Sequence, residues 1–186
     1  RTPEVDLRPA GITTDPLVPG DTVEISYFVD ITNPGFLRSD ASWTERVFLT
    51  DDRRIDGRGV EIQLIQLVFT AEAGRERELS APVPFLDDVF TGNNLTAAMI
   101  QRGLFLTVQI DSRDLVSERR ENNNQTAGTA RWSLPDLQVV DLETPTLRFD
   151  QVLDSLTYAT TNTGSASVPA GSGWTDQKTE EHTSEL

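Results

Sequence analysis

The chain has 186 residues, with 16 Lys and Arg against 30 Asp and Glu, so its formal net charge at pH 7 is −14. This charge disfavours binding to the phosphate backbone of a nucleic acid or to an anionic membrane. The chain has no cysteine, which excludes a disulfide framework, a thiolate zinc site and a cysteine nucleophile. Its apolar runs are only a few residues long, whereas a membrane-spanning helix needs roughly 20.

Alternation of apolar and polar residues, rather than a helical period, dominates the chain. Val23 to Ile31 places five apolar side chains on one face of an extended strand. Similar β-like runs cover residues 43–50, 60–70, 78–85, 104–110 and 127–134. Pro82 and Pro84 indicate an edge or a strand end, because proline cannot donate to a β-ladder. The segment from Leu95 to Arg102 fits a short helix, a strand or a loop.

Turn-forming residues separate these runs. Asn-Pro-Gly follows the first strand, and Asp-Gly, Ala-Gly, Gly-Asn-Asn and Glu-Asn-Asn-Asn follow later ones. Such residues tolerate a positive φ or preset a turn. About seven short strands within about 130 residues predict an all-β fold, an antiparallel β-sandwich.

The chain also contains an internal repeat. "VDLRPAGITT" at residues 5–14 returns as "PDLQVVDLET" at residues 135–144. Thr-Asn-x-Gly also recurs, and its two Asn residues, Asn33 and Asn162, are 129 positions apart (162 minus 33). Trp-Thr-acid recurs as well, at Trp43 and Trp174. We therefore predict a complete domain over 4–133, the amino-terminal part of a second over 134–176, and a polar, disordered tail over 177–186.

The second copy is too short to form a sandwich by itself. About a third of such a domain cannot bury its own apolar faces. We expect it to be poorly ordered, to pack on the first copy, or to complete itself by self-association with another molecule. Because the chain starts at Arg1 without a signal sequence, we expect it to be part of a longer polypeptide.

Several of these motifs, in this order, resemble the CARDB repeat, the cell-adhesion-related domain found in bacteria. They are the Asp-Leu openings at Asp6 and Asp136, the Pro19-Gly20 turn, the two Asn-x-Gly and Trp-Thr-acid motifs, and "DSRDLVSERRENNN" at residues 111–124. The resemblance implies an immunoglobulin-like sandwich of seven strands, in tandem arrays within large bacterial cell-surface or secreted proteins, and no catalysis. The segment from Leu86 to Gly103 is longer than the family pattern.

The acidic segment at residues 111–124 is the candidate metal site. Asp111, Asp114, Glu118 and Glu121 offer hard oxygen ligands of the kind that Ca²⁺ prefers. The alternative is a structural hairpin whose Asn side chains imitate backbone turns. Three arginines of the same segment, Arg113, Arg119 and Arg120, are expected to form ion pairs with several of these acids, which weakens the metal hypothesis.

Other motifs favour structural roles. The acids of "DDRRIDGRG" at residues 51–59 lack the spacing of an EF-hand loop and indicate a solvated loop. Trp43 and Trp132 could stack on sugars, but a role in the core fits them better. The only histidine is His182 in the polar tail, and no Gly-rich phosphate loop is present, so we predict that the chain is not an enzyme and needs no organic cofactor.

These observations favour a non-catalytic extracellular adhesion or spacer repeat of a large bacterial surface or secreted protein. Its partners would be neighbouring repeats and an unidentified protein or glycan, without nucleic acid and without membrane insertion. The alternative is a glycan- or protein-binding module, acting through loops such as 51–59 or 86–103 and accessory to a secreted hydrolase.

Overall fold

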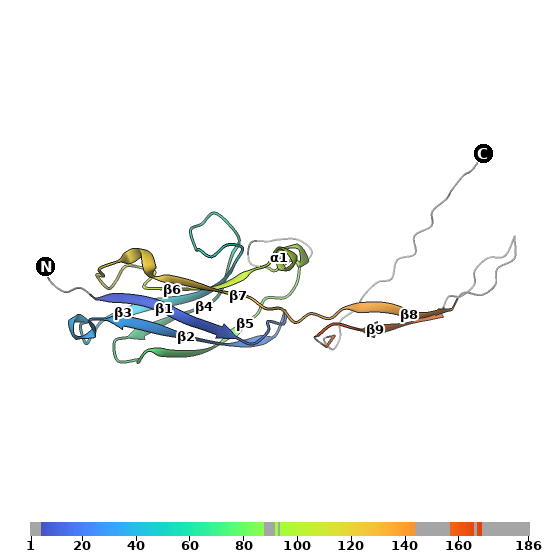
Figure 1. The fold of residues 1–186 in the computed structure, drawn as a ribbon, viewed down its shortest axis with the longest axis horizontal. Coiled ribbons are helices and arrows are strands. Elements are labelled where there is room, and N and C mark those ends of the chain that lie inside the picture. Colours follow the sequence, from blue (N-terminus) through green and yellow to red (C-terminus); the bar gives the residue numbers. More distant parts are fainter. Residues whose placement is uncertain (1–4, 88–91, 93, 144–156, 166, 169–186) are drawn as a thin grey trace. The chain divides into compact units, whose positions relative to one another are not determined.

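The computed structural model describes residues 5–87, 92, 94–143, 157–165 and 167–168. The chain divides into two compact units, Arg1–Ser133 and Leu134–Leu186, and each is described by itself (Figure 1). Trp174, His182 and the predicted tail at 177–186 lie outside the described residues. Within the described part, no helix has the length and apolar character needed to span a membrane.

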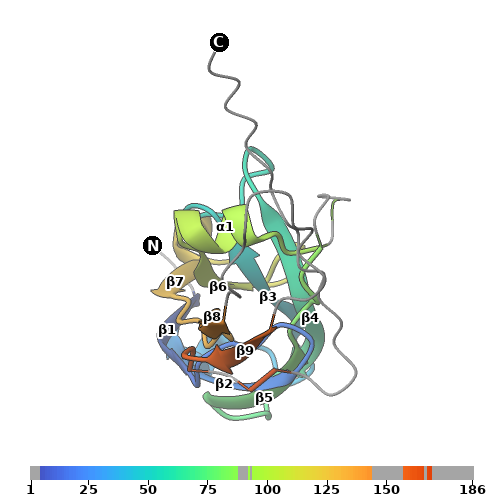
Figure 2. The same cartoon turned by 90° about the vertical axis from the view of Figure 1, so that its right-hand side faces the viewer.

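The first unit is a sandwich of two antiparallel sheets, with strand orders β1-β2-β5 and β4-β3-β6-β7. Figure 2, which looks along this unit, shows the two layers. The strands are β1 (Asp6–Thr14), β2 (Thr22–Thr32), β3 (Ser42–Thr50), β4 (Glu61–Thr70), β5 (Glu76–Pro82), β6 (Phe105–Ile110) and β7 (Gln125–Thr129). This arrangement confirms the predicted all-β, immunoglobulin-like sandwich of seven strands.

Three elements differ from the sequence expectation. β1 was not among the predicted strands, because Pro9 and Gly11 interrupt its pattern; Gly11 occupies a β-bulge with φ 63°. β7 ends at Thr129, earlier than the predicted run over 127–134, and Trp132 beyond it forms an isolated bridge with Leu17. The ambiguous segment before β6 contains a short helix, α1 (Ala97–Arg102), whose first turn is capped by the Thr96 hydroxyl.

Alternate side chains of the strands form the core between the two sheets. The apolar positions predicted for the inner face of β2, from Val23 to Ile31, are all buried. β3 and β6 bring Val47, Leu49, Leu106 and Val108 from the opposite sheet. Burying one such side chain contributes about 1.5–3 kcal/mol, so this period-two stripe determines which way each strand faces.

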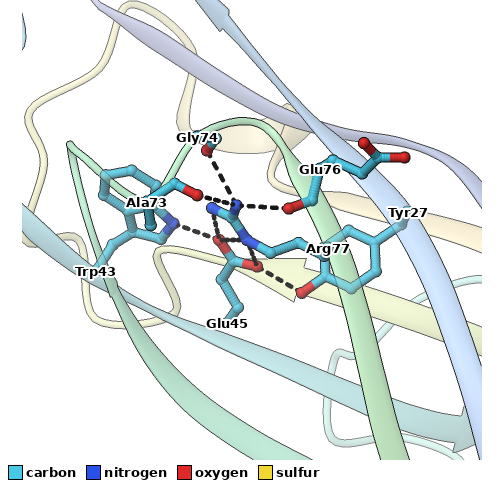
Figure 3. Close-up of polar contacts among 7 residues, drawn as sticks. All are labelled: Tyr27, Trp43, Glu45, Ala73, Gly74, Glu76 and Arg77. Carbon is cyan, nitrogen blue, oxygen red and sulfur yellow. Dashed lines mark hydrogen bonds and ion pairs between the residues drawn. The ribbon is translucent and has the colours of Figure 1, made fainter.

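A charged pair lies at the centre of this core (Figure 3). Arg77 of β5 and Glu45 of β3 form an ion pair with an Nη2–Oε1 distance of 2.9 Å, although their side chains are only 1% and 0% exposed. Trp43 Nε1 donates to Glu45 Oε1 at 2.7 Å, and the Tyr27 hydroxyl donates to Glu45 Oε2. Burial of Tyr27 and the neighbouring Glu45 carboxylate raise the tyrosine pKa above its ordinary value.

The rest of the Arg77 guanidinium is also satisfied. Its Nη1 donates to the carbonyl oxygens of Gly74 at 2.9 Å and Glu76 at 3.2 Å, and its Cζ lies 4.0 Å from the Phe69 ring centre. The network therefore joins β2 and β5 of one sheet to β3 of the other. Trp43 is fully buried, which confirms its predicted role in the core, and the acid of the Trp-Thr-acid motif serves the same core.

The described residues of the second unit include an antiparallel hairpin of β8 (Leu137–Glu143) and β9 (Thr157–Asn162). Its first strand has a β-bulge between Val140 and Glu143, with Asp141 at φ 51°. Gly11 in the bulge of β1 precedes Asp141 by 130 positions (141 minus 11), which is the offset of the sequence repeat. The two hairpins thus share a local backbone feature. Their registers differ by two residues, because Leu7 pairs with Ile31 whereas Leu137 pairs with Asn162 and not with Thr160, the repeat equivalent of Ile31.

Candidate metal site in the hairpin between β6 and β7

The acidic hairpin occupies residues 111–124, at the end of the first unit where β1 begins (Figure 1). Asp111 directly follows β6, with φ 47° and an exposed fraction of 1%. Its carboxylate accepts hydrogen bonds from the backbone N–H groups of Leu115 at 2.9 Å and Val116 at 2.8 Å. These bonds fold the start of the hairpin and point the carboxylate inward.

Glu118 is the second buried acid of the hairpin. Its Oε2 accepts a hydrogen bond from the backbone N–H of Leu7 in β1, and its Oε1 accepts one from Asn124 Nδ2 at 3.0 Å. Burial raises the pKa of Glu118 to about 7; the two donors act against this rise, while the neighbouring Glu121 and Asp111 add to it. Carboxylates grouped this closely attract a cation.

Three of the four predicted ligands come together. One carboxylate oxygen from each of Asp111, Glu118 and Glu121 lies within 4.8 Å of the others. The fourth, Asp114, also has a positive φ of 50°, but it is not part of this group. Glu121 is exposed, and its Oε1 accepts a hydrogen bond from the Glu118 backbone N–H at 3.0 Å.

Two neutral oxygens near the cluster were not predicted. Asn124 Oδ1 and Ser112 Oγ are buried without a hydrogen-bond partner, and only 6% of Asn124 is exposed. Both residues line a depression of about 660 Å³, together with Asp111, Asp114 and Glu121. A buried oxygen without a donor is unusual, and in the sequence these Asn residues fit turn positions.

The predicted arginine partners are absent from this cluster. Within residues 111–124, all of which are described, Arg113, Arg119 and Arg120 form no ion pair with Asp111, Glu118 or Glu121. The expectation that they neutralise these acids was wrong. The hairpin bends back on itself through Asp111 and Glu118, so its acids bond to backbone N–H groups and to Asn124 instead.

The acids of the loop between β3 and β4 do not come together; each of them bonds to a backbone N–H group. Asp51 Oδ1 accepts from Val60 N–H at 2.9 Å, and Asp52 Oδ1 accepts from Arg54 N–H at 2.6 Å. Asp56 Oδ1 accepts from Arg58 N–H at 3.1 Å. These side chains stabilise turns, as predicted for this loop, and they do not join a metal-binding group among the described residues.

Comparisons with known proteins show a similarity in fold. A scan against protein-family models and a search of curated proteins each gave no match. Among solved structures, the chain is similar to the CARDB domain of a protein from Pyrococcus furiosus, crystallised in complex with di-metal ions. The identity is 15%, the TM-score is 0.45, and the match covers 69% of this chain and 89% of the other. This similarity concerns the fold alone.

Proposed function

We propose that the chain is a non-catalytic extracellular adhesion or spacer repeat of a large bacterial surface or secreted protein. The observation that supports this best is the recurrence of a bulged hairpin, with Gly11 and Asp141 both in the left-handed conformation at the offset of the sequence repeat. Repeats of this kind fold as separate units joined in series, which extends a polypeptide away from its anchor. The proposed domains are 4–133 and 134–176.

The chemistry of the first unit fits a structural module. Its most heavily bonded acid, Glu45, is committed to an ion pair in the core, with no exposed side-chain surface. The negative net charge of the chain keeps copies apart in a crowded array. These properties suit a rigid, repelling spacer better than a site that binds and transforms a substrate.

Protease treatment of intact cells tests the proposed location. Antibodies raised against the full chain would detect its parent protein in the source bacterium before and after an external protease is added. We expect the signal to disappear from intact cells while a cytosolic marker persists. Protection of the protein until the cells are lysed would contradict an extracellular spacer.

A binding module is the second candidate. The depression beside the acidic hairpin is also lined by Arg53, Arg54 and Ile55 of the loop between β3 and β4, and loops on a rigid sandwich commonly carry specificity. A glycan array probed with the full chain tests this candidate. Binding that is lost in an Arg53→Ala, Arg54→Ala double variant would favour it over the spacer alone.

We also propose that the acidic hairpin binds Ca²⁺. The donor set fits this ion, because three carboxylates lie within 4.8 Å of one another and two residues with unpartnered neutral oxygens, Ser112 and Asn124, line the same depression as Asp111 and Glu121. Ca²⁺ takes six to eight oxygen ligands, some of them water. A cation that binds only the folded state must stabilise it. We therefore expect a higher Tm in 2 mM CaCl₂ than in EDTA, and an unchanged Tm would exclude the site.

A further inference from the structure

The acidic hairpin holds the start of β1. Glu118 Oε2 accepts from the Leu7 backbone N–H, and the Arg119 backbone N–H donates to the Val5 carbonyl at 2.8 Å. The Asn123 amide donates to both carboxylate oxygens of Asp6, at 3.2 and 3.1 Å. These contacts join residues more than 100 positions apart in sequence, so the start of β1 depends on the hairpin keeping its shape.

Glu118 takes part both in the acidic cluster and in the contacts that hold the start of β1. One of its oxygens faces Leu7 of β1, and the other faces Asn124, whose own Oδ1 is buried without a partner beside the depression. Asp111 and Glu121 bring two further carboxylates within 4.8 Å. Like charges at this separation repel, so a cation among the three carboxylates would stabilise the hairpin.

We propose that Asn124 Oδ1 is a neutral protein ligand of the hairpin cation, beside Asp111, Glu118 and Glu121, and that binding of the cation fixes the start of β1 through Glu118. This inference rests on the proposed Ca²⁺ site. Its physical basis is that the cation removes the repulsion among the three carboxylates and holds Glu118 in the orientation that accepts the Leu7 N–H. Occupancy of the site thereby controls how firmly the amino-terminal strand is attached.

Backbone hydrogen exchange of the full chain tests the coupling. The exchange rate of the Leu7 amide, followed by NMR in 2 mM CaCl₂ and in EDTA, is expected to fall at least tenfold with Ca²⁺. The amide of Val47 in β3, which lies in the opposite sheet, serves as the reference for any change in global stability. A Leu7 rate that changes no more than the Val47 rate would overturn the coupling, even if Ca²⁺ binds.

Two variants of the same hairpin separate the ligand set from a general charge effect. Glu121→Gln keeps an oxygen acceptor for the Glu118 N–H but removes one charge from the cluster, so we expect Ca²⁺ affinity, measured by calorimetry, to fall at least tenfold. Asp114→Asn removes one charge outside the cluster and tolerates the same positive φ; its affinity should change less than threefold. Equal losses in the two variants would overturn the ligand assignment.

Asn124→Asp tests the neutral ligand directly. If Asn124 Oδ1 faces the cation, an added charge there tightens Ca²⁺ binding severalfold, although the variant is less stable in EDTA because it loses the donor to Glu118. If Asn124 has only a structural role, the stability loss occurs without tighter binding, and the assignment fails. Absence of Ca²⁺ binding to the unaltered chain would instead remove the proposed site itself.

Discussion

Replacement of Arg77 by methionine gives the sharpest test of the core. Methionine keeps much of the side-chain length but removes the counter-charge of Glu45, whose side chain is 0% exposed. Glu45 would retain only the Tyr27 and Trp43 donors. Removing one partner of a buried pair costs about 3–5 kcal/mol. With a urea slope of about 2 kcal/mol/M, the unfolding midpoint should fall by about 2 M.

Urea titration followed by tryptophan fluorescence measures this shift, since Trp43 lies within the network. Arg38→Met is the matched control. Arg38 and Asp40 form a shorter ion pair, at 2.7 Å, but their side chains are 81% and 68% exposed, and we expect the midpoint to stay where it is. A second variant, Glu45→Gln with Arg77→Met, should recover part of the loss because no charge remains buried. If R77M unfolds at the unaltered midpoint, the buried pair does not stabilise the sandwich as argued.

Three further predictions concern other parts of the chain. The pKa of Tyr27 is raised in the folded state, so its contribution to the free energy of unfolding is complete below the unfolded pKa of about 10 and falls above it by about 1.4 kcal/mol per pH unit. The free energy of unfolding of Tyr27→Phe, measured by denaturation at pH 9 and 11, should lack this decrease. Gly11→Ala should destabilise the first unit by about 1–2 kcal/mol in urea, because φ 63° disfavours a side chain; an unchanged stability would contradict the strain. Val139→Glu should reduce self-association in sedimentation, since Val139 is 56% exposed on β8; equal association of both chains would exclude that face.

The fold was predictable because its signals are local. The alternation from Val23 to Ile31 requires one buried face, and the Asn- and Gly-containing turns separate the strands at the spacing typical of a sandwich or a barrel. β1 could not be recognised by the same rule, since Pro9 and Gly11 interrupt the alternation that the bulge then restores in three dimensions. Its place at the sheet edge tolerates both residues.

The candidate site was predicted only in part, because convergence depends on the path of the hairpin. Sequence spacing gave equal weight to Asp114 and Glu118, but Asp111 folds the segment through bonds to Leu115 and Val116 and leaves Asp114 outside the cluster. Asn124 resembled a turn residue. Its buried, unpartnered oxygen is visible only once the hairpin has closed.

The Glu45–Arg77 pair has a consequence for chains built from similar domains. Neighbouring copies can exchange strands while they fold, which is a characteristic failure of such proteins. A one-residue slip of β3 would turn Glu45 to the other face of its sheet and leave the guanidinium of Arg77 buried without its acid, which costs about 3–5 kcal/mol. The buried pair therefore favours a single register of β3 among those that such an exchange could produce.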